Sequence, residues 1–403
     1  MTDPSAWRAS LIAAHRRFSG GRPDPTEESR VIEQHLLRHA GRYWESRTGE
    51  RAAVQLVRVD HRTTGRLLWY RVTLNSGVRN LVVKVMDLSH VSAERLRLAG
   101  LADPTDNFLR EYNAVKKVHD HFATLADERL GHAPILDRIG ENGAIVMEEV
   151  AGTQMSRLFL GHNRLRPQQS PDALLSAAHR AGAWLREFHS VPVAPTVIDR
   201  SDRNEFVDLV AVYCSYIDMR LKKPAYLSAL SSSVRNAAER VLPYDLPVAL
   251  AHGDFAMRNV IVQRSGRVLV LDTLARRHAP IYEDLATFLI GMRSGRLQLY
   301  TFGIAFAPTL LRAVELAVLD GYYGDSVQPT GHRKVYEMLV LLDRWAAALA
   351  RNPADRLGRS PARYLANRWF ERETRRAAAL LESLPRTRGG ATGTAHSCRA
   401  TPE

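Results

Sequence analysis

The sequence predicts an α+β protein with a small strand-rich lobe followed by a larger helical lobe, and three observations support this. Between residues 51 and 150, short runs rich in Val, Leu and aromatic residues alternate with turn-forming segments, which is typical of antiparallel strands. After residue 151, apolar residues recur mainly at three- and four-residue intervals, the spacing of amphipathic helices. With 403 residues, of which 45% are hydrophobic, the chain can bury a sizeable core. A ligand site is expected in the cleft between the lobes.

The elements of the first lobe follow in order along the chain. Residues 1–50 have the spacing of two amphipathic helices, at 5–18 and 27–45, and are assigned to an N-terminal helical extension. The runs AAVQLVRV, GRLLWYRVTL and NLVVKVM then predict an antiparallel meander of three strands. A helix over residues 107–125 and two further strands, ILDRIG and AIVMEEV, complete a five-stranded sheet in residues 51–150.

The larger lobe is expected in residues 151–385, after a hinge near Glu149. Three short strands, VALAHGD, VIVQRSG and RVLVLDT, interrupt a mainly helical pattern. Residues 386–403 lack apolar periodicity and are predicted to form a disordered tail. The predicted helices cover residues 171–189, about 204–242, 282–299, 302–322, 331–350 and 360–384.

Composition excludes some classes of protein and leaves one question open. The formal net charge of +13 is typical either of a protein that binds anions or of a solvated arginine-rich surface. No basic run is interleaved with aromatic residues, so a nucleic-acid partner is not favoured. Cys214 and Cys398 lie too far apart to indicate a zinc site or a disulfide framework. The apolar runs are shorter than the roughly 20 residues of a membrane span, and no secretory signal is recognised, so we expect a cytoplasmic protein.

The segment HGDFAMRN at residues 252–259 and a downstream Asp272 could together carry phosphoryl transfer. This reaction depends on an orienting carboxylate, metal ligands and a cation on the phosphates. Asp254 follows an apolar strand and a glycine, so its carboxylate is expected on an exposed loop. The strand pair VIVQRSGRVLVLD then forms a hairpin that brings Asp272 beside Asn259. An amide oxygen and a carboxylate, completed by phosphate oxygens and water, form a ligand set appropriate to Mg²⁺.

This pattern resembles the aminoglycoside phosphotransferase family, part of the protein-kinase-like superfamily. The loop of that family reads H-G-D-x-x-x-x-N, and a strand-end aspartate follows about a dozen residues later. The resemblance implies a protein-kinase-like two-lobed fold, with a five-stranded antiparallel N-lobe and a mostly helical C-lobe. It also implies an ATP- and Mg²⁺-dependent transfer to a hydroxyl group of a small molecule. Asp254 would accept the hydroxyl proton, while Asn259 and Asp272 would hold the metal. The matching residues are His252, Gly253, Asp254, Asn259 and Asp272.

The resemblance also assigns roles to residues of the first lobe. Lys84 lies in the apolar run LVVKVM, where an unpaired ammonium is costly. It would hold the α- and β-phosphates of ATP, and Glu111 on the next helix would orient it. The run AIVMEEVAG resembles the hinge strand of the family, with Met147 lining the pocket of the base. The alternative interpretations are a water-facing lysine for Lys84, a solvated helix face for Glu111 and a plain buried strand for the run AIVMEEVAG. The main-chain contacts to adenine would come from Glu148, Glu149 and Val150.

Four further residues have supporting or open roles. Arg258 either neutralises charge on the transferring phosphoryl group or pairs with a nearby acid. His189 and His252 are interpreted as structural, the second as an organiser of the loop. Asp284 matches the supporting aspartate of the family, which anchors the catalytic loop. Thr273 follows Asp272 where relatives often have Phe-Gly.

The charge of the C-terminal region bears on the acceptor. Residues 285–403 contain 17 lysine and arginine residues against 10 aspartate and glutamate residues. This disfavours a polycationic antibiotic and favours a neutral or anionic hydroxyl compound, such as a sugar or a glycosylated metabolite. The rival hypotheses are a nucleotide-binding pseudokinase that acts as a scaffold and a nucleic-acid-binding protein. The sequence predicts no oligomeric state.

Overall fold

The structure is a computed structural model that describes most of the chain. The predicted helix at 5–18 and the predicted tail at 386–403 lie outside the described residues. The described residues are 25–39, 42–43, 53–62, 65–86, 104–139, 143–164, 170–192, 201–273, 277–350 and 361–385.

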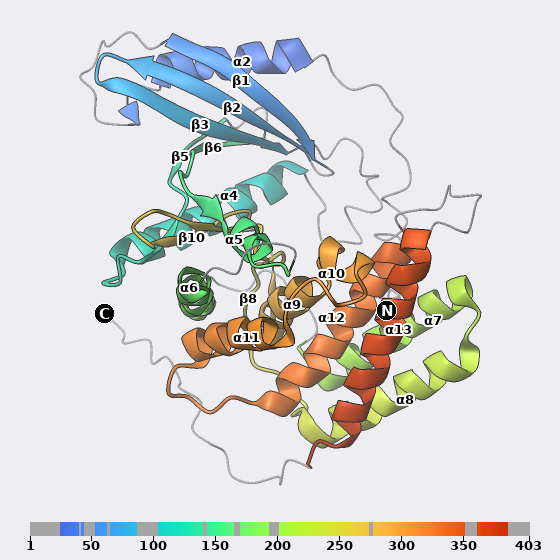
Figure 1. The fold of residues 1–403 in the computed structure, drawn as a ribbon. Coiled ribbons are helices and arrows are strands. Elements are labelled where there is room, and N and C mark those ends of the chain that lie inside the picture. The colour runs from blue at the N-terminus through green and yellow to red at the C-terminus, as the bar shows by residue number, and fades with distance from the viewer. Residues whose placement is uncertain are drawn as a thin grey trace, which may run out of the picture.

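A five-stranded sheet forms the first lobe, and it confirms the predicted antiparallel sheet (Figure 1). The strand order is β1-β2-β3-β6-β5, and every neighbouring pair is antiparallel. Helix α2 (Pro25–His39) lies along one face of the sheet and ends before the residue 45 that the sequence predicted. Ile32 and Leu36 of α2 are fully buried against alternate residues of the strands. The strands are β1 (Ala53–Arg62), β2 (Gly65–Leu74), β3 (Gly77–Met86), β5 (Ile135–Ile139) and β6 (Ala144–Glu148).

Two smaller sheets position the segment that carries the predicted catalytic residues. The order of the first is β4-β10-β9-β7, and the second pairs β8 with β11. The three short strands predicted in this region are confirmed as β8, β9 and β10. The other three were not predicted, because their residues, LGH, TQ and HAP, lack the valine-rich runs that indicate β8, β9 and β10. The strands are β4 (Leu130–His132), β7 (Thr153–Gln154), β8 (Val248–Leu250), β9 (Val260–Val262), β10 (Val268–Val270) and β11 (His278–Pro280).

Helices make up most of the second lobe, as predicted, but two predicted helices are each divided. The stretch 204–242 forms two helices, because Lys222 adopts a left-handed conformation with φ 54° and Pro224 opens the next helix. The stretch 282–299 breaks at Ser294 and Gly295. Helix α4 (Pro104–Thr124) belongs to the first lobe. The helices of the second lobe are α5 (Met155–Gly161), α6 (Asp172–His189), α7 (Arg203–Leu221), α8 (Pro224–Val241), α9 (Tyr282–Arg293), α10 (Arg296–Tyr300), α11 (Pro308–Tyr323), α12 (Thr330–Ala350) and α13 (Pro361–Glu382).

Helices α6 and α11 pack closely because each has a glycine at the contact. A Cβ atom at Gly182 would overlap the carbonyl oxygen of Val318, and one at Gly321 would overlap that of His179. We expect Gly321→Ala to destabilise the protein by at least about 2 kcal/mol, since the two backbones must separate. An alanine normally stabilises a helix relative to glycine, so the sign of the change is decisive.

Urea denaturation followed by circular dichroism measures this difference. The matched control is Gly161→Ala at the end of α5, where a Cβ atom meets nothing within 4 Å. If Gly321→Ala were as stable as the control variant, the close packing of α6 on α11 would be incorrect.

A buried ionic cluster joins α9, α11 and α12. Glu315 of α11 and Arg333 of α12 are each only 3% exposed, and their charged groups lie 3.0 Å apart. Arg293 of α9 pairs with Glu315 and with Glu337, and Lys334 lies 2.8 Å from Glu337. Burial alone would raise the pKa of Glu315, but the charges of Arg293, Lys334 and Arg333 outweigh it and hold that pKa at about 2.

This cluster predicts a loss of stability in acid. Because the pKa of Glu315 is lowered from 4.5 to about 2 in the folded state, its stabilising effect is complete above pH 4.5 and disappears as the pH falls toward 2. The contribution is on the order of 3 kcal/mol. We expect Glu315→Gln to lower the free energy of unfolding at neutral pH by roughly 3–5 kcal/mol, because buried Arg333 and its neighbour Arg293 then keep only the carboxylate of Glu337. The variant should also lose part of the acid dependence, measured by urea denaturation from pH 3 to 7, whereas exposed Glu128→Gln should change neither. An unchanged acid dependence in Glu315→Gln would contradict this assignment.

Candidate active site

Asp284 fixes the loop that carries the predicted catalytic residues. Its carboxylate, in the first turn of α9, accepts hydrogen bonds from the backbone N–H groups of His252 at 2.7 Å and Gly253 at 3.0 Å. Burial alone would raise the pKa of Asp284, but contacts with His189 and His252 outweigh this effect and lower the pKa. The predicted anchoring of the loop by Asp284 is confirmed.

Both predicted structural histidines lie inside the protein. His252 is fully buried, and burial lowers its pKa, so the ring is neutral at neutral pH. Its Nδ1 accepts a hydrogen bond of 3.3 Å from the backbone N–H of Asp254, which orders the loop. His189 lies 2.8 Å from the hydroxyl of Tyr322 and 3.4 Å from Asp284. These contacts agree with organising roles for both rings.

Trp184 of α6 packs against the same loop, a contact that was not predicted from the sequence. Its ring stacks on Phe122 of α4 and Phe255 of the loop, with centroids 4.8 and 6.0 Å away. Its Nε1 donates a hydrogen bond of 2.7 Å to the carbonyl oxygen of Gly131 in β4. One side chain thus connects α4, β4 and the loop, which gives the exposed residues of the loop a rigid base.

Asp254, Arg258 and Asn259 form a hydrogen-bonded group at the loop surface. Arg258 Nη2 lies 2.5 and 2.6 Å from the two carboxylate oxygens of Asp254. Asn259 Nδ2 donates to the Asp254 carbonyl oxygen at 2.8 Å and to its carboxylate at 3.0 Å. Of the two interpretations of Arg258, the structure shows the pairing with an acid, and that acid is the predicted catalytic carboxylate. A hydroxyl group that approaches Asp254 must therefore share or displace this contact.

The β9–β10 hairpin brings Asp272 next to Asn259, as the sequence predicted. The backbone N–H of Leu271 donates to the carbonyl oxygen of Asn259 at 2.8 Å. Asp272, which follows the second strand of the hairpin, therefore lies beside Asn259, which precedes the first. Asp272 has a φ of 61°, a left-handed conformation that aspartate tolerates better than most residues. Its Oδ1 lies 2.8 Å from Nζ of Lys84. This ion pair joins the five-stranded sheet to the second lobe.

Lys84 and Met147 project from the same face of the sheet. In an antiparallel sheet, directly paired residues share a face, and alternate residues along a strand do too. Lys84 pairs with Ile145, and Val82 pairs with Met147, so all four lie on the face opposite α2. This face turns toward Asp272 of the second lobe. The predicted Lys84–Glu111 pair stays a prediction, because the side chain of Glu111 in α4 lies outside the described residues.

The hinge after β6 already uses two of its backbone donors. The N–H of Glu148 donates to the carbonyl oxygen of Pro134, and the N–H of Glu149 to that of Asn80, each at 3.0 Å. A cavity of about 320 Å³ borders Glu148, Glu149 and Val150 on the side of α4 and β10. Neither Lys84 nor Met147 lines this cavity, so it is not the pocket that the sequence analysis predicted for the base.

A larger cavity, of about 710 Å³, opens beside the loop and was not predicted from the sequence. Ala256, Met257 and Arg258 of the loop line it, together with residues of α5, α9, α10, α12 and α13. Its lining residues come from segments up to about two hundred positions apart, so no local pattern could reveal them. Among the described residues of the lining there is no aspartate or glutamate, whereas Arg258, Arg296 and Arg344 are present. We call it the loop cavity.

Asn259 and Asp272 are the protein oxygen ligands that fit the predicted Mg²⁺. The amide nitrogen of Asn259 donates to Asp254, so its oxygen is the atom left for a hard cation. No group of three or more His, Cys, Asp and Glu side chains suited to a metal occurs in the described part of the chain. The two oxygens therefore fit a cation whose remaining ligands come from phosphate and water.

None of the helices described is long and apolar enough to cross a membrane.

Comparison with known proteins agrees with a protein-kinase-like phosphotransferase. Residues 69–324, more than half of the chain, match the sequence model of the Phosphotransferase enzyme family, and the protein belongs to this family. A search of curated proteins gives no significant match.

Similar solved structures have low sequence identity to this chain. A choline/ethanolamine kinase family protein from Mesorhizobium loti is 17% identical, with a TM-score of 0.52, and the match covers 88% of this chain and 98% of that one. A choline kinase from Streptococcus pneumoniae is 12% identical, with a TM-score of 0.48 and coverage of 88% and 99%. A spectinomycin phosphotransferase, solved with ADP and spectinomycin, is 13% identical, with a TM-score of 0.45 and coverage of 87% and 98%. At 17% identity, the likeness to the Mesorhizobium loti protein concerns the fold alone.

Proposed function

We propose that the protein transfers the γ-phosphoryl group of ATP to a hydroxyl group of a small molecule, with Mg²⁺ as the metal. The observation that carries this proposal is a continuous chain of contacts where the two lobes meet. Lys84 bonds to Asp272, Asp272 leaves the hairpin beside Asn259, and Asn259 bonds to Asp254. A cation for phosphates, two oxygen ligands for a metal and a carboxylate are thus adjacent, and phosphoryl transfer requires this set.

The nucleotide would lie between the two lobes. Lys84, oriented by Glu111, would bind the phosphates, and Met147 on the same sheet face would line the pocket of the base. Because the N–H groups of Glu148 and Glu149 donate within the protein, the N–H of Val150 and the hinge carbonyl groups would serve the adenine. Bound by Asn259 and Asp272, Mg²⁺ would supply positive charge against the phosphate oxygens.

Asp254 would orient the acceptor hydroxyl and accept its proton. The acceptor oxygen forms a bond to the γ-phosphorus, the bond from that phosphorus to the bridging oxygen of ADP breaks, and the hydroxyl proton passes to the Asp254 carboxylate. Arg258 bonds to Asp254 and also lines the loop cavity, so it would stand between the carboxylate and the acceptor. That position would allow it to meet the phosphoryl group when the acceptor displaces it from Asp254.

A small-molecule acceptor is supported by the family and by the cavity. The structural neighbour with a TM-score of 0.52 is named as a choline/ethanolamine kinase family protein. A volume of about 710 Å³ beside the loop lies within the range of roughly 300–1,000 Å³ that is common for small-molecule sites.

Calorimetry and a coupled ADP assay on the full chain test this proposal. We expect ATP to bind more tightly with Mg²⁺ than with EDTA, and ADP release to rise when a suitable alcohol is added. A folded protein that bound no nucleotide under either condition would exclude the proposed function. Binding without turnover for any acceptor would favour a nucleotide-binding scaffold instead.

A further inference from the structure

The lining of the loop cavity indicates the chemical class of the acceptor, and this inference rests on the proposed function. We infer that the acceptor is an amphipathic alcohol, with a largely apolar body, an anionic group and no positive charge. Ala256, Met257 and Arg258 line the loop cavity, and Arg258 lies 2.6 Å from Asp254, so a molecule in the cavity is next to the proposed base.

The walls of the cavity are mainly apolar. Phe159 of α5 and Phe306 stack with ring centroids 4.1 Å apart and form one wall. Phe370 of α13 contributes another wall. Leu160 and Tyr300 also line the cavity, and they are 44% and 50% exposed. Large apolar side chains that remain exposed around a concave site favour an occupant that covers them.

Outside the loop itself, the described lining contains arginine and no aspartate or glutamate. Arg258 and Asp254 compensate each other, whereas Arg296, exposed at the start of α10, contributes positive charge at the border of the cavity. Arg344 of α12 also lines the cavity, and it donates to the carbonyl oxygen of Thr287 in α9 at 3.2 Å. The guanidinium of Arg296 repels a cationic acceptor and attracts an anionic group.

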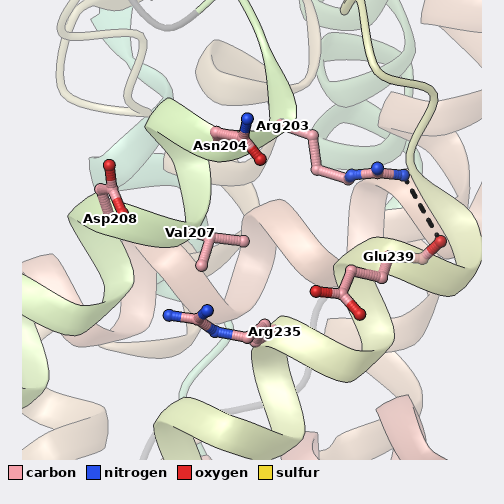
Figure 2. A pocket seen from close by; sticks show the side chains of 6 residues that line it. All are labelled: Arg203, Asn204, Val207, Asp208, Arg235 and Glu239. Carbon is pink, nitrogen blue, oxygen red and sulfur yellow. Dashed lines mark hydrogen bonds between the residues drawn. The ribbon is translucent and has the colours of Figure 1, made fainter.

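The acids that might bind a cationic acceptor are engaged elsewhere. Asp202 caps α7, where its carboxylate accepts hydrogen bonds from two backbone N–H groups at 2.7 and 2.9 Å. Glu371 of α13 bonds to Lys223 and Arg375. Asp208 and Glu239 line a separate hollow between α7 and α8, together with two arginines (Figure 2).

That separate hollow has mixed charges and no residue of the loop. It has a volume of about 480 Å³, and Arg203 donates there to the backbone oxygen of Glu239 (Figure 2). The acidic residues of α7 and α8 therefore do not line the loop cavity. Among the described residues, the acids of α7 and α8 therefore form no site for a polycation next to Asp254.

Three matched probes test the inference on the full chain. They share a naphthalene body with a hydroxymethyl group and differ at one position, which carries a carboxylate, a carboxamide or an aminomethyl group. Fluorescence titration without nucleotide measures their dissociation constants, and the ADP assay with Mg-ATP measures KM. We expect the carboxylate probe to bind at least about tenfold more tightly than the aminomethyl probe, with the amide between them. Equal affinities, or tighter binding of the amine, would overturn the inference.

A pair of charge-reversal variants locates the effect. Arg296→Glu should reduce the preference for the carboxylate probe about tenfold or more, whereas Arg235→Glu in the separate hollow should leave it unchanged. If both variants behaved alike, the anionic group would not be read in the loop cavity. Nucleotide affinity is measured in parallel. A wild-type protein that binds Mg-ATP but does not discriminate between the probes contradicts only this inference, whereas a wild-type protein that does not bind ATP contradicts the proposed function.

Discussion

Replacing Asp254 with asparagine is expected to lower turnover by roughly 10²- to 10⁴-fold, the usual contribution of a positioned general base. Asparagine has nearly the same size and can still accept a hydrogen bond from Arg258, but it cannot take the proton of the acceptor. The affinity for Mg-ATP should change only a few-fold, because the Asp254 carboxylate bonds to Arg258 and Asn259, and the phosphates would be held by Lys84. Initial rates of ADP release measure the first effect, and calorimetry measures the second.

The matched control is Asp208→Asn, which removes an exposed carboxylate of α7 in the separate hollow. It should retain the turnover and the nucleotide affinity of the wild type. If Asp254→Asn kept more than about a tenth of wild-type turnover, the loop carboxylate would not be the base. Equal losses of turnover and nucleotide affinity would instead indicate that Asp254 acts through the position of Asn259.

Local signals in the sequence were sufficient to predict the loop and the hairpin. Asp254, Asn259 and Asp272 lie within one strand–loop–hairpin segment, and strand ends and turns fix their relative positions. Asp284 could be added because it opens the helix that follows. Lys84 was recognised because a charge in an apolar strand is costly. Its contact with Asp272 was not predicted, because it joins residues 188 positions apart and depends on how the two lobes meet.

The loop cavity was not predicted from the sequence, because it depends on a helix break that the sequence does not reveal. One helix was predicted over residues 282–299, but the chain breaks at Ser294 and Gly295, and α10 then lines the cavity. A glycine in a helical pattern costs only about 1 kcal/mol, so sequence alone does not decide between a break and a continuous helix. The break between α7 and α8 had a clearer signal in Pro224, which begins the second helix.

Asp272→Asn is expected to remove most of the effect of Mg²⁺ on ATP binding and to lower turnover by at least about a hundredfold. The carboxylate is one of the two proposed metal ligands, and it also bonds to Lys84 at 2.8 Å. An amide is a weaker ligand for a hard cation and carries no charge to balance the Lys84 ammonium. Calorimetric titrations of ATP, with Mg²⁺ and with EDTA, measure the metal-dependent part of the affinity directly.

The control for this variant is Asp120→Asn, which removes an exposed carboxylate of α4 from a surface pair with Lys116. Such a pair contributes at most about 1 kcal/mol to stability, so binding and turnover should be unchanged. Thermal denaturation of both variants separates a loss of fold from a loss of metal binding. If Asp272→Asn bound ATP with the same dependence on Mg²⁺ as the wild type, the metal would not be held at the end of the β9–β10 hairpin. The contact between Lys84 and Asp272 would then serve only to join the two lobes.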